Sequence, residues 1–205
     1  MTDTQARNRY NVPMNLPNII TVGRILLIPV FVIVYLIPGD LTYIITAVFF
    51  GLAALTDWLD GYLARRLNQT TPFGAFLDPV ADKLIVVSAL VILIAHHDTV
   101  WLTLPGLVIV GREIVISGLR EWMAEVNRAG ARMLAVGILG KVKTTLQMIA
   151  IVMLLAHEPD LSAPWVIAAY ILLYVAAVMT LWSMTIYLRA AWPTLRGGLT
   201  SVKTD

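Results

Sequence analysis

Six apolar runs, each about long enough to cross a lipid bilayer, constrain the fold of this chain more than any other feature. They comprise residues 19–37, 41–59, 76–95, 100–119, 136–156 and 163–188. A spanning helix needs about 20 mainly apolar residues. The chain is 59% hydrophobic and only 14% charged, whereas a soluble domain carries about 25% charged residues. We therefore predict an all-α integral membrane protein with six transmembrane helices.

The basic residues between these runs gather on one side of the predicted membrane. Loops 38–40, 96–99 and 157–164 contain no Lys or Arg, whereas the other loops and both ends do. Because short cytoplasmic loops are enriched in Lys and Arg, we expect a multi-pass protein with both termini in the cytoplasm. The net charge is only +2, which does not indicate a nucleic-acid partner. The absence of cysteine excludes disulfides and cysteine-bound metals.

The chain is predicted to form one membrane domain between two short ends. Residues 1–18 are interpreted as a cytoplasmic or interfacial segment, which includes Pro13 and Pro17. Residues 19–190 form the six-helix domain, and residues 191–205 are expected to be a disordered cytoplasmic tail.

Two aspartates mark the cytoplasmic end of the second run. Asp57, Asp60, Gly61 and Ala64 are spaced at i, i+3, i+4 and i+7. On a helix these positions share one face. An acidic face with small residues beside it is therefore predicted at this end of the helix.

A second acidic stripe begins the third run. Gly74, Asp78 and Asp82 are spaced by four residues. Proline fits only near the start of a helix, so Pro79 places that start near Gly74 or Asp78. Because the intervening segment reverses the chain, the two acidic faces can meet.

Four converging carboxylates predict a divalent metal site. Each Asp at a helix centre costs about 2.5–3.5 kcal/mol on insertion scales, so the group needs a compensating partner or a water-filled cavity. A ligand set made only of oxygen favours Mg²⁺ or Mn²⁺ over zinc, and two such ions support in-line phosphoryl displacement. Gly61, Ala64 and Gly74 would let a base and a diphosphate approach the backbone, and Arg65 would bind phosphate oxygens.

Further cations indicate a second anionic substrate. Arg112 lies about 16 Å along its helix from Trp101, well inside the bilayer, where an arginine is a poor topology anchor. Arg120 follows toward the cytoplasmic end, and Lys141 and Lys143 begin the next run. Together they would form a basic pocket for a substrate that carries a phosphate. For Lys141 and Lys143, a role as topology anchors stays open.

Residues 57–82 match the signature of a known family at every fixed position. The pattern is Asp-x2-Asp-Gly-x2-Ala-Arg, eight residues, then Gly-x3-Asp-x3-Asp, and it resembles that of the CDP-alcohol phosphotransferases. The resemblance implies the six-helix fold of that family and an enzyme, usually a homodimer, in the bacterial cytoplasmic (inner) membrane. Such an enzyme transfers a phosphatidyl group from CDP-diacylglycerol to an alcohol at the cytoplasmic side and releases CMP.

The resemblance also implies roles for the four aspartates and for several residues near them. Asp57, Asp60 and Asp78 would bind one divalent cation, and Asp57, Asp78 and Asp82 the second. Asp82 would also be the general base. Contacts with the nucleotide diphosphate are implied for Gly61, Arg65 and Thr71. Residues 17–21, which include Asn18 and Thr21, resemble the segment that closes over the CDP group.

Three further segments resemble one branch of the family, namely residues 15–24, 112–125 and 140–148. The acceptor implied by this branch is sn-glycerol 3-phosphate, with its phosphate held by Arg112, Arg120 and either Lys141 or Lys143. One alternative is the same chemistry with serine, inositol phosphate or a phospholipid as acceptor. Another is an ion or proton transporter whose intramembrane acids form a relay.

Overall fold

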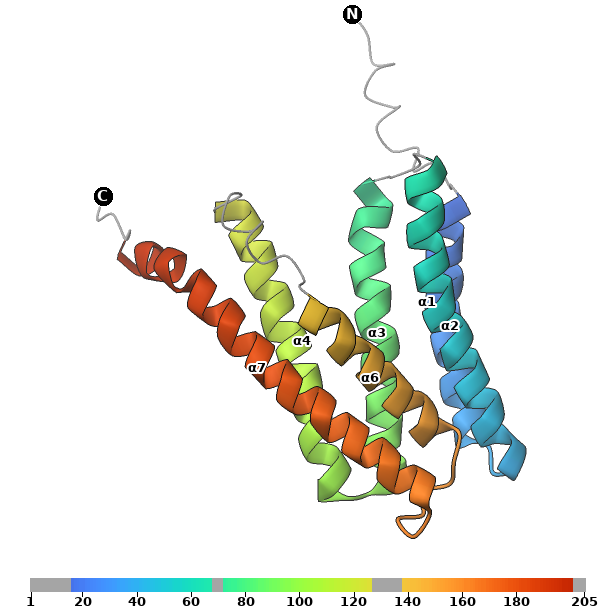
Figure 1. The fold of residues 1–205 in the computed structure, drawn as a ribbon. Helices are drawn as coiled ribbons and strands as arrows, with labels where there is room; N and C mark the ends of the chain where they lie inside the picture. Colours follow the sequence, from blue (N-terminus) through green and yellow to red (C-terminus); the bar gives the residue numbers. More distant parts are fainter. Residues whose placement is uncertain (1–15, 68–71, 127–137, 201–205) are drawn as a thin grey trace, which may run out of the picture. The chain divides into compact units, whose positions relative to one another are not determined.

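A computed structural model describes residues 16–67, 72–126 and 138–200 (Figure 1). These residues form six α-helices and no strand. The helices are α1 (Leu16–Leu36), α2 (Asp40–Leu67), α3 (Pro72–His97), α4 (Val100–Val126), α6 (Ile138–Leu155) and α7 (Pro164–Thr200). Each predicted apolar run corresponds to one helix, so the all-helical prediction is confirmed for the described part of the chain.

Several helices extend beyond their predicted apolar runs, and two of these boundaries bear on the predictions above. α3 begins at Pro72, close to the expected Gly74, and Pro79 therefore lies inside the helix. α7 continues to Thr200 with Pro193 inside it, although residues 191–205 were expected to be a disordered tail. The helix is extended by packing, because Ala191 is buried against Met123 of α4. Residues 201–205 lie outside the described residues.

The chain divides into two compact units, residues 1–89 and 90–205, with the boundary inside α3. In the first unit α1 packs against α2. The rings of Phe31 and Phe50 meet edge to face with centroids 6.1 Å apart, and Tyr35 and Tyr43 do the same at 5.8 Å. Such aromatic pairs contribute about 0.5–1.5 kcal/mol beyond their buried area, so they stabilise the pairing of these two helices.

In the second unit α7 packs against both α4 and α6. Its core contains Leu102 and Ile109 of α4, Leu154 of α6 and Leu173 of α7, all fully buried. α7 is therefore the helix that joins the other two, and polar residues on its inner face are held at fixed positions.

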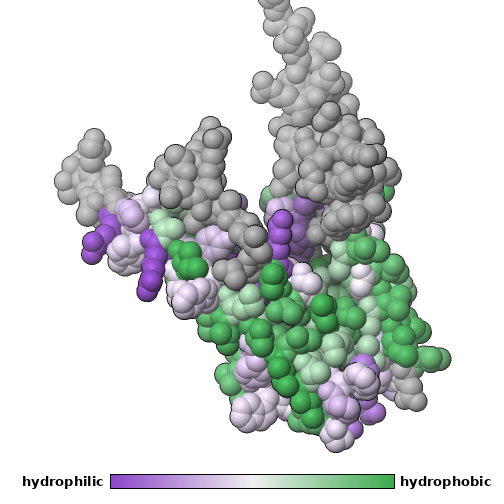
Figure 2. Space-filling model, viewed as in Figure 1, coloured by the Kyte–Doolittle hydropathy of each residue, from purple (hydrophilic) through white to green (hydrophobic). Residues whose placement is uncertain are grey.

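Among the described residues, three helices are long and apolar enough to cross a membrane, with spans at Asn18–Leu36, Val100–Met123 and Pro164–Arg196. Large apolar side chains are exposed on their outer surfaces, among them Leu26, Leu107 and Val178, and Figure 2 shows this apolar surface in green. Exposed apolar surface of this extent marks contact with lipid or another protein. The chain is thus a membrane protein, while six spans stay a prediction, because α2 offers only a shorter apolar stretch, Leu41–Thr56, within its described side chains.

A buried histidine joins the end of α3 to α7. His97 Nδ1 lies 3.0 Å from the hydroxyl of Tyr170, which is also 3.3 Å from Thr99 Oγ1. His97 is 7% exposed and follows the predicted third span. Burial, with a smaller contribution from His96, lowers the pKa of His97 to about 4. The ring is therefore neutral at pH 7.

This lowered pKa predicts a loss of stability in acid. The folded state binds its proton near pH 4, whereas an unfolded histidine does so near about 6.5. Between these values the unfolded state holds more protons, so the free energy of unfolding should fall by up to about 3 kcal/mol as the pH drops from about 6.5 to about 4. Denaturation of the detergent-solubilised chain at several pH values across this range measures the free energy of unfolding. His97→Phe should remove this dependence and His96→Phe should retain most of it; an unchanged slope in His97→Phe would contradict the assignment.

Candidate functional site

α1 carries a buried polar stripe in an otherwise apolar helix. Asn18, Thr21 and Arg24 follow one another at intervals of three residues, and all three are almost completely buried. Burial of a guanidinium inside a membrane protein requires a counter-ion or other hydrogen-bond partners. The stripe therefore needs acidic groups on a facing helix.

α3 supplies two such groups. Thr21 Oγ1 donates a hydrogen bond to Asp78 Oδ1 at 2.8 Å. Arg24 Nη1 donates to Asp82 Oδ1 at 2.7 Å, where the Arg24 side chain is 1% exposed and that of Asp82 48% exposed. The buried Arg24 side chain thus holds the half-exposed carboxylate of Asp82 in place. Sequence reasoning gave Arg24 no role, although its spacing of three from Thr21 was the available signal.

The predicted partners on α2 lie where the structure describes the backbone alone. α2 is helical from Asp40 to Leu67, so residues 57, 60, 61 and 64 occupy one helical face. The side chains of Asp57, Asp60, Gly61, Ala64 and Arg65, and the whole of Thr71, lie outside the described residues. Among the side chains that are described, no three His, Asp or Glu residues are close enough to hold a metal ion. Convergence of the four aspartates therefore stays a prediction.

The described half of this group fits a hard divalent cation. Asp78 and Asp82 lie one turn apart on α3, and Gly74 lies buried one turn before them. The possible metal ligands that the structure describes here are carboxylate and hydroxyl oxygens, which Mg²⁺ and Mn²⁺ prefer. Thr21 and Arg24 bind Oδ1 of the two carboxylates, and these bonds restrict the rotation of both side chains. Hydrogen bonds from neighbouring residues orient ligating carboxylates in metal sites in the same way.

A second polar group forms in the other unit, where α4 and α6 meet α7. Arg112 is 7% exposed and Lys143 is 4% exposed. Arg112 Nη1 donates to Glu113 Oε1 at 2.6 Å, and Lys143 Nζ lies 3.4 Å from the same oxygen. One carboxylate oxygen thus bridges two buried cations.

α7 adds three neutral partners to these cations. Lys143 Nζ donates to Thr180 Oγ1 and Arg112 Nη2 donates to Ser183 Oγ, each at 3.4 Å. Arg120 Nη2 donates to the hydroxyl of Tyr187 at 3.3 Å. The Tyr187 ring also lies 5.8 Å from the Arg112 guanidinium carbon and 5.2 Å from that of Arg120, within the range of cation–π attraction. Sequence reasoning missed these three residues, although their spacing at i, i+3 and i+7 within an apolar run was a signal.

The charges of this cationic cluster do not balance. Arg112, Arg120 and Lys143 carry three positive charges, and Glu113 is the one carboxylate bonded to them among the described residues. The Nε atoms of Arg112 and Arg120 are buried and have no hydrogen-bond partner there. A buried unsatisfied N–H group costs about 1–3 kcal/mol, so an added anion would be stabilised at this cluster. Lys141 is exposed and is not bonded to Glu113.

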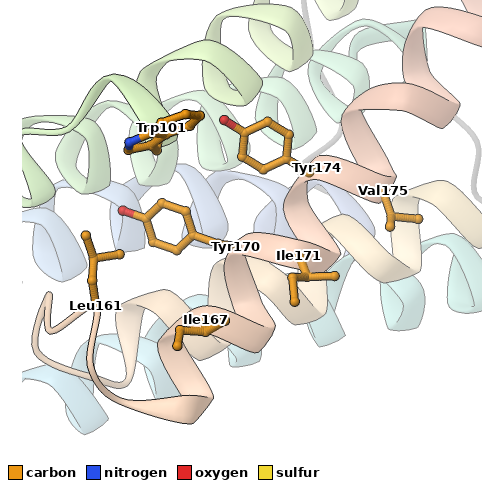
Figure 3. A pocket seen from close by; sticks show the side chains of 7 residues that line it. All are labelled: Trp101, Leu161, Ile167, Tyr170, Ile171, Tyr174 and Val175. Atoms are coloured by element: carbon orange, nitrogen blue, oxygen red, sulfur yellow. The ribbon is translucent and has the colours of Figure 1, made fainter.

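An apolar groove of about 400 Å³ lies elsewhere in the same unit (Figure 3). Its lining is Trp101, Leu161, Ile167, Tyr170, Ile171, Tyr174 and Val175. No lining residue is charged, and none belongs to the predicted site. The groove is therefore separate from the residues that the sequence predicts to contact charged substrates.

Comparison with known proteins shows the family to which the chain belongs. A family model described as CDP-alcohol phosphatidyltransferase matches residues 14–182. The chain belongs to this family. The matched region contains the stripe on α1, the two described carboxylates of α3 and the cationic residues of α4 and α6. The resemblance seen in the signature is thus confirmed.

Three relatives carry the same name, CDP-diacylglycerol–glycerol-3-phosphate 3-phosphatidyltransferase. The protein of Pseudomonas fluorescens is 55% identical over 185 residues, which cover 89% of this chain and 93% of that protein. The protein of Haemophilus influenzae is 50% identical over 177 residues, covering 86% and 93%. That of Yersinia enterocolitica is 50% identical over 182 residues, covering 89% and 97%. The similarity therefore extends over nearly the whole length of each relative.

The ion pair between Arg24 and Asp82 predicts a measurable coupling. Arg24→Met and Asp82→Asn each remove the pair, so the double variant should lose less stability than the sum of the two single variants. We expect a coupling of about 1–2 kcal/mol, below the about 3–5 kcal/mol lost on breaking a fully buried pair, because water screens the half-exposed Asp82. Unfolding free energies of the four proteins in detergent give the value.

The control cycle combines Arg24→Met with Asp98→Asn. Asp98 is an exposed residue between α3 and α4, so this pair should be additive. Additivity in the Arg24 and Asp82 cycle as well would show that the ion pair contributes nothing to stability.

Proposed function

We propose that the chain transfers the phosphatidyl group of CDP-diacylglycerol to the 1-hydroxyl of sn-glycerol 3-phosphate, giving phosphatidylglycerophosphate and CMP. The observation that carries this proposal is the 55% identity, over 89% of the chain, to a relative named for that activity. Two features of the structure support it. One is the pair of oriented carboxylates on α3, and the other is a cationic cluster with more positive than negative charge.

Two divalent cations, Mg²⁺ or Mn²⁺, would be held by Asp57, Asp60, Asp78 and Asp82. When bound, such ions neutralise charge on a diphosphate and on the transferring phosphoryl group. The support is the oxygen-only donor set of α3 and the hydrogen bonds that orient Asp78 and Asp82. Arg24 and Thr21 then act by holding these two carboxylates for the metal and the substrate.

Asp82 is the general base of the proposed reaction. Its side chain is 48% exposed and therefore accessible to an acceptor hydroxyl, and Arg24 fixes one of its oxygens. Asp82 takes the proton of the 1-hydroxyl as the oxygen of that hydroxyl attacks the β-phosphorus of CDP-diacylglycerol. The bond from this phosphorus to the oxygen of CMP breaks, and CMP leaves with the electron pair. Orientation of base and nucleophile supplies much of the acceleration in such transfers.

The acceptor phosphate binds Arg112, Arg120 and Lys143. Among the described residues, these three carry three positive charges and are bonded to one carboxylate. The buried Nε–H groups of Arg112 and Arg120 have no hydrogen-bond acceptor there. Arginine suits this role because its planar N–H groups match phosphate oxygens. Lys141, which is exposed, is a topology anchor at the cytoplasmic side. CDP-diacylglycerol would be contacted by Asn18, Thr21, Gly61, Ala64, Arg65, Thr71 and Gly74.

The enzyme works in the bacterial cytoplasmic membrane, with six spans and with both termini and the active site facing the cytoplasm. The distribution of Lys and Arg among the loops supports this topology. The family resemblance supports a homodimer. Acyl chains of the lipid substrate remain in the bilayer, so the substrate enters from the side.

An acceptor competition tests the proposed activity. The purified chain in detergent with CDP-diacylglycerol and Mg²⁺ should release radiolabelled CMP with sn-glycerol 3-phosphate and not with serine, which brings no phosphate to the cationic cluster. Asp82→Asn is the control and should abolish turnover. Turnover with serine but not with sn-glycerol 3-phosphate would contradict the proposed acceptor. Absence of CMP release with every acceptor would contradict the proposed transferase activity.

Two neighbouring lysines allow a matched test of the acceptor site. Lys143 is buried against Glu113 and Thr180, whereas Lys141 is exposed. Lys143→Ala should raise the KM for sn-glycerol 3-phosphate about 10–100-fold, since a hydrogen bond to a charged group contributes about 1.5–3 kcal/mol. Its KM for CDP-diacylglycerol should change less than about twofold. Lys141→Ala should change neither constant; equal effects of the two variants would show that burial of Lys143 is unrelated to substrate.

A further inference from the structure

Glu113 occupies the position between Arg112 and Lys143 that an anionic ligand of these cations would need. Its Oε1 is the one charged acceptor bonded to both among the described residues, at 2.6 Å from Arg112 Nη1 and 3.4 Å from Lys143 Nζ. The Glu113 side chain is 28% exposed, whereas Arg112 and Lys143 are 7% and 4% exposed. The carboxylate is thus the most accessible member of the group.

α7 holds the two cations independently of Glu113. Thr180 accepts a hydrogen bond from Lys143, Ser183 accepts one from Arg112, and the ring of Tyr187 lies beside the Arg112 guanidinium. All three partners are neutral, so they fix the positions of the cations without cancelling their charge. An anion that replaces Glu113 therefore meets donors that are already placed, which lowers the entropic cost of binding.

The Glu113 carboxylate compensates the charge of Arg112 and Lys143 when no ligand is bound. It is not needed for this once an anionic ligand is bound. Without an anion, two buried cations lie near each other uncompensated, which is strongly unfavourable. A phosphate dianion bound to the same N–H groups would instead be repelled by a carboxylate between them, since like charges in close contact near a protein surface repel each other strongly. Phosphate and Glu113 thus exclude each other at these donors.

We infer that Glu113 is a resident anion that the acceptor phosphate displaces, and that this competition makes the site specific for acceptors carrying a phosphate dianion. The inference rests on the proposed acceptor site. A neutral polyol or a zwitterionic amino acid cannot compensate Arg112 and Lys143, so Glu113 keeps its place and the acceptor does not bind. A dianion compensates both cations and replaces the carboxylate. Glu113 is on this account a specificity-determining residue.

Glu113→Gln removes the charge at nearly constant shape and tests the inference in the full-length chain. Inorganic phosphate should inhibit CMP release by this variant with an inhibition constant about tenfold below that of the unchanged chain. The KM for sn-glycerol 3-phosphate should fall similarly, and that for CDP-diacylglycerol should stay within about twofold. Glu121→Gln, an exposed position on the same helix, is the matched control and should leave all three constants unchanged.

Thermal denaturation gives a readout that does not depend on turnover. Without phosphate, Glu113→Gln should melt below the unchanged chain, because its cations lack their counter-ion. Added inorganic phosphate should raise its melting temperature more than that of the unchanged chain, since a ligand of the folded state stabilises in proportion to its affinity. Phosphate binding that is unchanged or weaker in Glu113→Gln would overturn the inference.

A second variant keeps the test decisive if Glu113→Gln does not fold. Ser183→Asp adds a carboxylate beside Arg112 and should raise the phosphate inhibition constant about tenfold; no change would overturn the role of a resident anion. The two proposals fail differently. If the unchanged chain releases no CMP with sn-glycerol 3-phosphate, the proposed function is wrong, and the phosphate-dependent melting of Glu113→Gln still decides the role of Glu113.

Discussion

Charge compensation among helices that otherwise face lipid is the constraint on which this structure depends. A buried guanidinium or ammonium in such surroundings must find a partner on another helix. Arg24 of α1 meets this need at Asp82 of α3, and Lys143 of α6 meets it at Glu113 of α4. In both places the cation is buried and the carboxylate is more exposed. The apolar scaffold therefore anchors the positive charges and leaves the acids accessible to ligands.

The helices could be predicted from the sequence because they depend on local patterns, whereas the convergence of the four aspartates stays a prediction. Apolar runs of about 20 residues become helices in a bilayer, and acids spaced by three or four residues on a helix share a face. Asp78 and Asp82 accordingly lie on successive turns of α3. Arg112 was singled out by its depth within an apolar run, and it is indeed buried.

What the sequence did not predict depends on contacts between helices. Lys141 and Lys143 look equivalent along the chain, yet only Lys143 is buried, because the orientation of α6 against α7 decides which of them faces inward. Arg24, Thr180, Ser183 and Tyr187 are defined as site residues only by the cations or carboxylates they contact. The helical end of α7 was missed for the same reason, since it packs through Ala191 against Met123 of α4.

The three neutral partners on α7 also set a limit on the length of that helix. Thr180, Ser183 and Tyr187 reach their cations only because they share one face, and Ala191 packs against Met123 further along. One residue inserted ahead of Thr180 would rotate the rest of the helix by about 100° relative to its beginning. The hydroxyl groups would then turn away from the guanidinium and ammonium groups although no side chain had been altered. α7 should therefore tolerate many substitutions on its lipid-facing side but no change in residue count between its two packed ends.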